Sequence, residues 1–235
     1  EKTVAGKNIK EIIKNQKPIN EDVIRPLKNP IYKEGSLAVL KGNLAPDGCV
    51  IKPAACEKKF LKHKGPVIVF DSYPEMNKII DSDDLDVSEN HVLVLRNVGP
   101  VGGPGMPEWG MIPIPKKLLK KGVRDMVRIS DARMSGTSYG ACILHVAPES
   151  YIGGPLSLLK TGDIVEIDVN KRSINMLVDN ETLQKRKSNL VQKKPKAGRG
   201  WLWMYSNHVR QANEGCDFDF LENDFGISAK EPDIF

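Results

Sequence analysis

A series of short apolar runs, separated by turn residues, constrains the fold of this chain more than any other feature. The runs contain five to seven residues, are rich in Val, Ile and Leu, and are bounded mainly by Gly, Pro, Asp or Asn. We expect strands at 36–40, 49–53, 66–70, 91–96, 125–130, 142–146 and 163–169, with a hairpin partner at 170–177. Many short strands at this spacing predict a mainly β fold, and the 40% of residues that are hydrophobic suffice for a packed core.

Helical signals are fewer and lie between or after the predicted strands. A helix is expected at 71–80, where Asp71 supplies a cap, and another at 115–122, which begins with proline and ends at glycine. Two more are expected at 179–190 and 201–215. The predicted fold class is therefore α+β, a barrel-like β domain with flanking helices.

The first 35 residues differ from the rest of the chain. Their prolines and the helix-spaced stretch 9–16 predict a connecting arm at 1–35 with little core of its own, followed by the domain at 36–235. The sequence begins with Glu1 rather than Met, so we expect it to be part of a longer protein.

Membrane and secreted proteins are disfavoured by the composition. No apolar run approaches the roughly 20 residues that a membrane-spanning helix needs, and the first residues lack the apolar core of a signal peptide. The cysteines have no CxxC spacing, so we expect free thiols in the cytoplasm: Cys49, Cys56, Cys142 and Cys216. Cys49 and Cys56 are close enough in sequence to suggest a metal site, but no His or Cys completes a ligand set around them.

Charge is distributed unevenly along the chain, although the net charge of +5 is mild. The stretch 185–199 is strongly basic, whereas the tail from Glu214 onward carries seven acidic residues and one lysine. A basic stretch of this kind could follow the phosphates of a nucleic acid. It contains no aromatic residue to stack on a base, so we favour a solvated linker and expect no nucleic-acid partner.

A glycine- and proline-rich segment at 97–110 follows one of the predicted strands. It holds five glycines and three prolines in fourteen residues, with Glu108 as its one acidic side chain. Such a constrained loop can hold a carboxylate in fixed geometry, which suits a hard cation such as Mg²⁺. The alternative is that Glu108 caps or pairs at the surface. A P-loop is excluded, because its Lys and Ser/Thr are absent.

A second unusual segment, 128–140, places hydroxyls, charges and glycines where another strand ends. Ser130 is a candidate turn residue, and Asp131 and Arg133 are candidates for a mutual ion pair. Ser135 lies between Met134 and Gly136, where backbone N–H groups can crowd its oxygen. A serine hydroxyl acts as a base or nucleophile only with help from a base, a metal or converging dipoles. His145 is expected on an apolar strand, where a core histidine is the simpler interpretation.

Five blocks of the sequence together resemble the C-terminal domain of the dihydroxy-acid/sugar-acid dehydratase family. They occur in the family's order between about residue 20 and residue 225 and read GSLAVLKGNLAPDGCVIKPAA, NVGPVGGPGMPEWG, SDARMSGTSYG, HVAPESYIGGPLSLLKTGDIVEID and GRGWLWMYSNHVRQANEGCDFDF. The wording DARMSGT is more similar to the pentonate branch, which contains L-arabinonate and D-xylonate dehydratases, than to the branched-chain amino-acid enzyme, which usually has DGRFSGG. The resemblance therefore favours a sugar acid as substrate.

The resemblance also implies a reaction and a fold. Members of the family remove water from a 2,3-dihydroxy acid to give a 2-keto-3-deoxy acid. They use an iron–sulfur cluster on the C3 oxygen and Mg²⁺ on the carboxylate and C2 hydroxyl. A serine, thought to act as an alkoxide, removes the C2 proton. The implied fold is a swivelling β-barrel domain similar to the mobile domain of aconitases.

Three residues of this chain take on family roles by their positions in the motifs. The resemblance implies Ser135 as the catalytic base, Thr137 as a substrate-binding residue and Glu108 as a Mg²⁺ ligand, whereas Ser130 falls outside the catalytic position. The cluster cysteines and the other Mg²⁺ ligands of the family lie in a larger N-terminal domain, and no cysteine of this chain matches a cluster ligand.

We therefore expect this chain alone to be inactive, and the full-length enzyme to be a homo-oligomer that joins this domain to its own N-terminal domain. Two alternatives remain open. One is a dihydroxy-acid dehydratase of branched-chain amino-acid biosynthesis, and the other is a non-catalytic binding module derived from this domain.

Overall fold

The computed structural model describes residues 2–31, 33, 35–133, 139–191, 193–194 and 197–221. The chain divides into two compact units, Glu1–Ser36 and Leu37–Phe235. The first unit contains the short helix α1 (Ile9–Ile13), which has a reciprocal cap: Glu11 N donates to Asn8 Oδ1 at 3.0 Å, and Asn8 N donates to Glu11 Oε2 at 3.0 Å. No residue of α1 is buried, so this helix depends on its cap rather than on a core.

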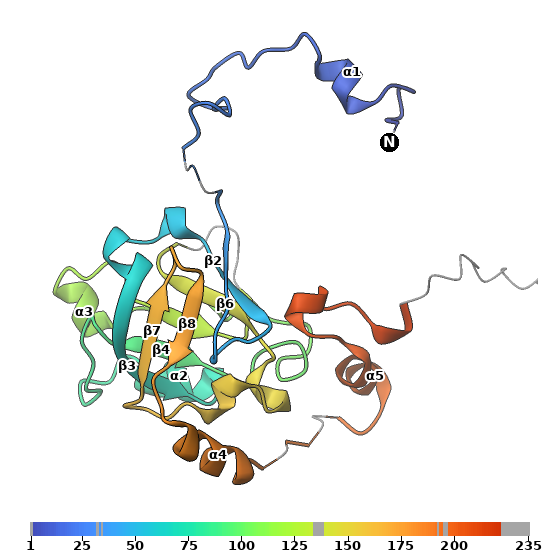
Figure 1. Cartoon of the computed structure of the whole chain (residues 1–235). Coiled ribbons are helices and arrows are strands. Elements are labelled where there is room, and N and C mark those ends of the chain that lie inside the picture. Colours follow the sequence, from blue (N-terminus) through green and yellow to red (C-terminus); the bar gives the residue numbers. More distant parts are fainter. Residues whose placement is uncertain are drawn as a thin grey trace, which may run out of the picture. The chain divides into compact units, whose positions relative to one another are not determined.

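One eight-stranded mixed sheet forms the centre of the second unit (Figure 1). Its strands are β1 (Ala38–Leu40), β2 (Gly48–Ile51), β3 (Lys62–Phe70), β4 (Val92–Leu95), β5 (Arg128–Ser130), β6 (Cys142–Ala147), β7 (Ile164–Asp168) and β8 (Ser173–Met176). They lie in the order β1-β2-β6-β5-β4-β3-β7-β8. Pairing is parallel from β3 through β4 and β5 to β6 and antiparallel elsewhere. The strands expected from the sequence, including the hairpin partner, are all confirmed.

Strand β3 is longer than the apolar run that predicts it. It begins at Lys62 rather than at 66, because its first half pairs antiparallel with β7 and its second half pairs parallel with β4. Lys62 lies opposite Asp168 in that first half, whereas Phe70 lies opposite Leu95 in the second. Backbone pairing with two different neighbours therefore extends the strand into a charged stretch that hydrophobicity alone would leave out.

The two outer strands of the sheet approach each other, so the sheet is nearly closed into a barrel. Lys41, directly after β1, forms a parallel bridge with Ser173 at the start of β8. Lys41 N donates to Arg172 O at 2.9 Å, and Ile174 N donates to Lys41 O at 3.1 Å. At Gly42 a Cβ atom would lie 1.9 Å from Ile174 O, so the approach at this point requires a glycine. The predicted barrel-like β architecture is thus present.

Apolar residues on the two faces of the sheet belong to two different cores. In β4, Val92 and Val94 belong to the core that all eight strands enclose. Leu93 and Leu95 point to the opposite face, where they belong to a second core together with Met76 of helix α2 (Tyr73–Ile79). Burial on both faces is typical of parallel strands and explains the unbroken apolar run of β4.

The remaining helices lie on the outside of the sheet. They are α2 (Tyr73–Ile79), α3 (Lys116–Lys120), α4 (Asn180–Ser188) and α5 (Gly200–His208). Single-turn 3₁₀ segments occur at Pro53–Ala55, Lys58–Leu61, Ser150–Ile152, Pro155–Leu158, Ala212–Glu214 and Asp219–Leu221. Within the described residues, no helix combines the length and the apolar character that crossing a membrane would require.

The cap of α2 differs from the prediction. Ser72, not Asp71, is the capping residue, since its Oγ accepts a hydrogen bond from Glu75 N at 3.3 Å. The carboxylate of Asp71 instead accepts a hydrogen bond from Arg96 Nε at 2.5 Å. The expected aspartate cap was therefore wrong, because a long-range partner engages the carboxylate that the local pattern assigned to the helix.

Candidate functional site

The glycine- and proline-rich loop starts at the edge of the sheet where β4 and β5 both end. These strands are parallel, and Leu95 lies opposite Ser130, so the residues that follow each of them meet at the same edge. Asn97 N and Val98 N, at the root of the loop, donate to the Asp131 carboxylate at 3.2 and 3.1 Å. Asp131 therefore joins the start of the loop to the end of β5.

Asp131 is fully buried and also binds a third segment. Ser150 donates to Asp131 Oδ2 through its backbone N at 2.9 Å and through its Oγ at 2.5 Å. Burial raises the pKa of Asp131, and the hydrogen bonds from Ser150, Val98 and Asn97 oppose that shift. The suggested pair of Asp131 with Arg133 was wrong, because among the described residues this carboxylate accepts its hydrogen bonds from Asn97, Val98 and Ser150, whereas Arg133 pairs with Glu108.

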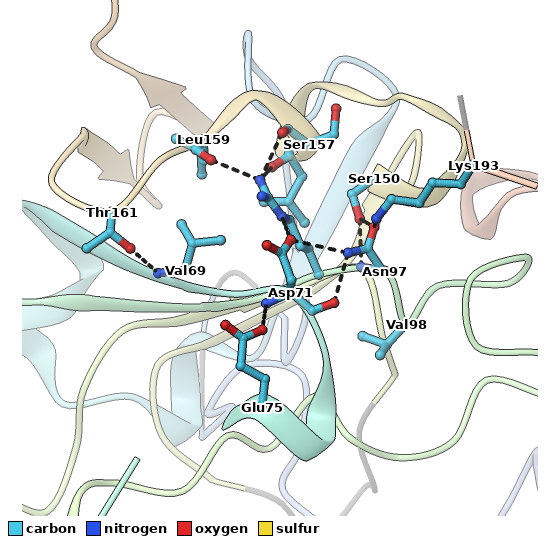
Figure 2. A network of polar contacts seen from close by, with 12 residues as sticks. Val69, Asp71, Glu75, Asn97, Val98, Ser150, Ser157, Leu159, Thr161 and Lys193 are labelled. Carbon is cyan, nitrogen blue, oxygen red and sulfur yellow. Dashed lines mark hydrogen bonds and ion pairs between the residues drawn. The ribbon is translucent and has the colours of Figure 1, made fainter. Parts of the chain in front are cut away.

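A network of polar contacts extends from the root of the loop to the surface (Figure 2). Asn97 Nδ2 donates to Asp71 O at 2.9 Å, and Lys193 Nζ donates to Asn97 Oδ1 at 2.5 Å. Burial opposes ionisation of Asp71, but hydrogen bonding and charge from Arg96, with further help from Lys193, outweigh it and lower the pKa of Asp71. One lysine of the basic stretch 185–199 is thus hydrogen-bonded to the domain, although it is exposed.

Glu108 lies further along the same loop and is half exposed. Its Oε1 is 3.6 Å from Arg133 Nη2, and Arg133 is also about half exposed. Arg133 is held in turn by the loop, because its Nε donates to Met106 O at 2.7 Å and its backbone O accepts from Gly110 N at 2.9 Å. The loop and the chain that follows β5 are therefore tied together next to the Glu108 carboxylate.

The two other predicted site residues, Ser135 and Thr137, lie outside the described residues. The structure does describe the positions on both sides of them. Arg133, two positions before Ser135, contacts Glu108. On the other side, Tyr139 O accepts a hydrogen bond from Arg128 Nη2 at 3.0 Å, and Gly140 N donates to Ala55 O at 2.9 Å. The two flanks of 134–138 are thus anchored at opposite ends of β5, Arg133 after its last residue and Tyr139 beside its first residue, Arg128.

A buried ion pair anchors the second flank. Arg128 Nη2 lies 3.1 Å from Asp125 Oδ1, and both side chains are at most 2% exposed. The same Asp125 oxygen accepts hydrogen bonds from Met126 N and Ala141 N, both at 2.8 Å. Gly140 packs against this pair so closely that a Cβ atom would lie 2.0 Å from Arg128 Nη2. The geometry of the pair and the path of the chain at Gly140 are therefore set together.

The structure also describes the surroundings of Ser130 and His145, which were singled out from the sequence. Ser130 is fully buried, and its Oγ accepts a hydrogen bond from Ala132 N at 3.0 Å, as in a turn. His145 is the one partly exposed residue of β6, has φ of 55° and donates from its N to Ala132 O at 3.1 Å. Burial lowers the pKa of His145, and the nearby charge of Arg133 lowers it further.

Glu108 can supply one oxygen ligand to a hard cation such as Mg²⁺, because its carboxylate is accessible and its loop is fixed. In the part of the chain that the structure describes, however, no three His, Cys, Asp or Glu side chains are placed to hold a metal ion together. Among the described residues, Glu108 is therefore a single candidate ligand and not part of a complete set.

The cysteines do not suit an iron–sulfur cluster. All four are free thiols, and burial raises the pKa of each. The pKa is raised to about 12 for both Cys49 and Cys56. A cluster is ligated by several thiolates brought close together, and among the described residues no three His, Cys, Asp or Glu side chains are placed to hold a metal together.

Sequence reasoning missed three residues of this site: Glu149, Ser150 and Gln211. Ser150 binds Asp131 across 19 positions, and Gln211 binds Glu149 across 62 positions. No local pattern marks such contacts, although a polar pair such as Glu149 and Ser150 beside a predicted buried strand is a signal that buried partners exist.

Comparison with known proteins finds one matching family and relatives that are all named as dehydratases. The family described as dihydroxy-acid/6-phosphogluconate dehydratase C-terminal matches residues 22–216. The chain is 50% identical over 218 residues to a 6-deoxy-6-sulfo-D-gluconate dehydratase of Pseudomonas putida. It is 42% identical over 220 residues to an L-arabinonate dehydratase of Rhizobium leguminosarum bv. trifolii, and 41% identical over 215 residues to a dihydroxy-acid dehydratase of Methanococcus aeolicus.

These similarities cover nearly the whole of this chain but only part of each relative. The three alignments span 92%, 94% and 91% of this chain, and 37%, 38% and 38% of the corresponding relatives. The chain therefore corresponds to less than two fifths of the length of those proteins.

Proposed function

This chain belongs to the dihydroxy-acid/6-phosphogluconate dehydratase C-terminal family, and on that premise we propose that it is the serine-bearing part of a hydro-lyase. The reaction we propose converts a 2,3-dihydroxy sugar acid to a 2-keto-3-deoxy acid. The observation that carries the proposal is the contact between Glu108 and Arg133 at the end of β5. It brings the proposed Mg²⁺ ligand to the chain that continues, two positions later, to the proposed base Ser135.

A sugar acid is the substrate class that we favour. Relatives that are 50% and 42% identical carry the names of a sulfogluconate and an arabinonate dehydratase. The wording DARMSGT, which is similar to the pentonate branch, supports the same choice. A dihydroxy acid of branched-chain amino-acid biosynthesis is the competing substrate, since relatives with that activity in their names are 41–43% identical.

The chemistry assigned to this chain is proton removal and substrate orientation. We propose that Ser135 Oγ takes the proton from C2, that Thr137 binds the substrate, and that Glu108 holds Mg²⁺ through one carboxylate oxygen. As the C2 proton moves to Ser135, the C2–H electrons form a C2–C3 double bond and the C3–O bond breaks. The departing hydroxide takes up a proton from solvent and leaves as water, and the resulting enol tautomerises to the 2-keto acid. When bound, the iron–sulfur cluster and Mg²⁺ supply Lewis acidity at the C3 oxygen and at the carboxylate end of the substrate.

The rest of the proposed enzyme lies outside this chain. We propose that an N-terminal domain provides the cluster cysteines and the other Mg²⁺ ligands, that the full-length enzyme is a cytoplasmic homo-oligomer, and that this domain is a swivelling one like the mobile domain of aconitases. The incomplete cation ligand set among the described residues supports the first part of this proposal. The free thiols support a reducing compartment.

A substrate panel on two proteins tests the proposal. We expect the full-length enzyme to dehydrate pentonates or hexonates faster than 2,3-dihydroxy acids of branched-chain biosynthesis, and this chain alone to give no turnover. Preference for the branched-chain acids would favour the competing substrate. A full-length protein that turns over none of these acids, with its cluster intact, would favour a non-catalytic binding module. Turnover by this chain alone would contradict the division of ligands proposed above.

A further inference from the structure

Glu149 is a buried carboxylate that lies against the glycine- and proline-rich loop. Its side chain is 0% exposed, and both of its oxygens accept hydrogen bonds from the turn at the start of that loop. Oε1 accepts from Val101 N at 2.8 Å, and Oε2 accepts from Gly102 N at 2.8 Å. The carboxylate therefore spans two consecutive backbone N–H groups, which fixes the path of the loop at this turn.

The backbone of the loop packs directly on the Glu149 side chain. A Cβ atom on Gly99 would lie 2.7 Å from both Cβ and Oε2 of Glu149. A Cβ atom on Gly102 would lie 2.8 Å from Tyr151 Cβ. Gly99 thus leaves the room that the carboxylate needs, whereas Gly102 lets the loop backbone pack closely on Tyr151.

Gln211 connects the same carboxylate to the C-terminal part of the domain. Its Nε2 donates to Glu149 Oε1 at 2.9 Å, and its Oε1 accepts from Glu149 N at 2.8 Å. The C-terminal segment also contacts the loop further along, since Cys216 Sγ lies 3.2 Å from Met106 Sδ. The loop that carries Glu108 is therefore held from the C-terminal side at two points.

We propose that Glu149 and Gln211 are positioning residues for the cation site, acting through the loop that carries Glu108. This inference rests on the proposed function, because it assigns Glu108 as the Mg²⁺ ligand. Neither residue is a catalytic residue, since each acts through backbone amides and not on substrate or metal. Their effect is to restrict the conformations of the loop, so that Glu108 is held ready for the cation before the cation arrives.

The substitution Glu149→Gln tests whether the positioning role requires the two acceptor oxygens of the carboxylate or only a side chain of that size. The variant keeps the size of the side chain but replaces an acceptor oxygen with an N–H₂ group, which then faces an N–H of Val101, Gly102 or Gln211. Glu166→Gln makes the same chemical change at an exposed position of β7 and is the matched control.

Two measurements are needed, and neither depends on turnover. Hydrogen exchange of the Val101 and Gly102 amides reports on the turn itself in this chain. Calorimetric titration with Mg²⁺ reports on the cation site in the full-length enzyme. We expect Glu149→Gln to accelerate exchange at both amides and to weaken Mg²⁺ binding about 10- to 100-fold, as the loss of a supporting hydrogen bond around a metal site does. We expect Glu166→Gln to leave the exchange rates of these amides and the Mg²⁺ affinity unchanged.

A purely structural role gives a different result. In that case Glu149→Gln lowers the unfolding temperature but leaves the Mg²⁺ affinity of the folded enzyme equal to that of Glu166→Gln, and the inference is overturned. If Glu149→Gln does not fold, Gln211→Ala replaces it, because it leaves the two loop hydrogen bonds of Glu149 in place. We then expect faster exchange of the Glu149 amide and a smaller loss of Mg²⁺ affinity. An unchanged exchange rate of the Glu149 amide together with an unchanged Mg²⁺ affinity in Gln211→Ala would overturn the inference.

Glu108→Gln distinguishes failure of the inference from failure of the proposed function. It removes the proposed ligand without touching the turn at Val101 and Gly102. Weak Mg²⁺ binding in Glu108→Gln together with normal binding in Glu149→Gln rejects the positioning role alone. Normal Mg²⁺ binding in Glu108→Gln rejects the ligand assignment on which the inference rests.

Discussion

Glu108 and Arg133 form an ion pair of 3.6 Å between Oε1 and Nη2, with both side chains about half exposed. Arg133 is fixed by the loop, whereas the carboxylate remains accessible from solvent. An exposed pair of this kind contributes only about 0–1 kcal/mol to stability. If Glu108 is the Mg²⁺ ligand that we propose, we therefore expect the cation to displace Arg133 from it at little cost.

Replacement of Glu108 with Gln removes one anionic oxygen while the loop keeps its shape. In the full-length enzyme we expect turnover at limiting Mg²⁺ to fall about 100-fold, because a neutral amide oxygen is a poor ligand for a hard cation. Turnover is measured against Mg²⁺ concentration, and addition of more Mg²⁺ is expected to restore part of it. A Mg²⁺ dependence identical to that of the unchanged enzyme would remove Glu108 from the site.

Replacement of Ser135 with Ala removes the proposed base. We expect turnover to fall at least about 100- to 10,000-fold, the usual contribution of a positioned acid or base, while the visible absorbance of the cluster stays unchanged. Thr137→Ser is the companion variant, and we expect it to alter KM more than kcat, because the resemblance assigns Thr137 to substrate binding. Substantial turnover in Ser135→Ala rejects the assignment of the base.

Replacement of Gly140 with Ala tests the anchor on the far side of 134–138. The added Cβ would lie 2.0 Å from Arg128 Nη2 and 2.4 Å from Asp125 Oδ1. Separation of this buried pair is expected to lower the free energy of unfolding by about 3–5 kcal/mol. Gly162→Ala is the control, since Gly162 has a similar φ of +96° but no heavy atom within 4 Å of the added Cβ. It is expected to cost only about 1–2 kcal/mol.

Urea denaturation of this chain measures the loss of unfolding free energy in Gly140→Ala and in Gly162→Ala. Equal losses of stability in the two variants would show that backbone strain alone, and not the packing of Gly140 on the Asp125–Arg128 pair, determines the cost.

Acid should weaken the attachment of α4 to the sheet. Asp163 accepts hydrogen bonds from both Nη1 and Nη2 of Arg186, the latter at 3.0 Å. Burial favours the neutral acid, but hydrogen bonding and charge from Arg186 outweigh it and lower the pKa of Asp163 below its ordinary value of 3.8. The stabilisation is therefore fully present above pH 3.8 and is lost as the pH falls through the lowered pKa of the folded state.

Asp163→Asn measures that stabilisation. We expect the variant to be less stable than the unchanged chain by about 2 kcal/mol at pH 7, and the difference to shrink as the pH falls below 4. Glu166→Gln on the neighbouring strand serves as the control. A difference that stays constant from pH 7 into the acid range would contradict the ionic origin of the contact.

Much of the fold could be predicted from the sequence because local patterns and burial agree. The run Val92–Leu95 is apolar throughout because both of its faces are buried, and that pattern predicts a buried strand correctly. The pattern fails where a distant partner decides the outcome. Asp71 has the position and chemistry of a helix cap, yet Arg96 engages its carboxylate.

The candidate site was less predictable than the fold. Glu108 could be singled out because its loop is unusual in composition, and Ser135 and Thr137 because their motif resembles a known one. The buried groups that support the loop could not be found in this way. Glu149 is 47 positions from Gly102 and 62 from Gln211, and only the folded chain brings the three together.

The bridge between Lys41 and Ser173 joins the outer strands of the sheet through two backbone hydrogen bonds, from Lys41 N to Arg172 O and from Ile174 N to Lys41 O. At this point the backbone groups of the two edges are used within the domain and cannot bind an added strand. Side chains offer another means of association with a domain or subunit, and helix α5 exposes two large ones, with Trp201 at 77% and Trp203 at 42% exposure. Intrinsic fluorescence from these two indoles would report such an encounter directly.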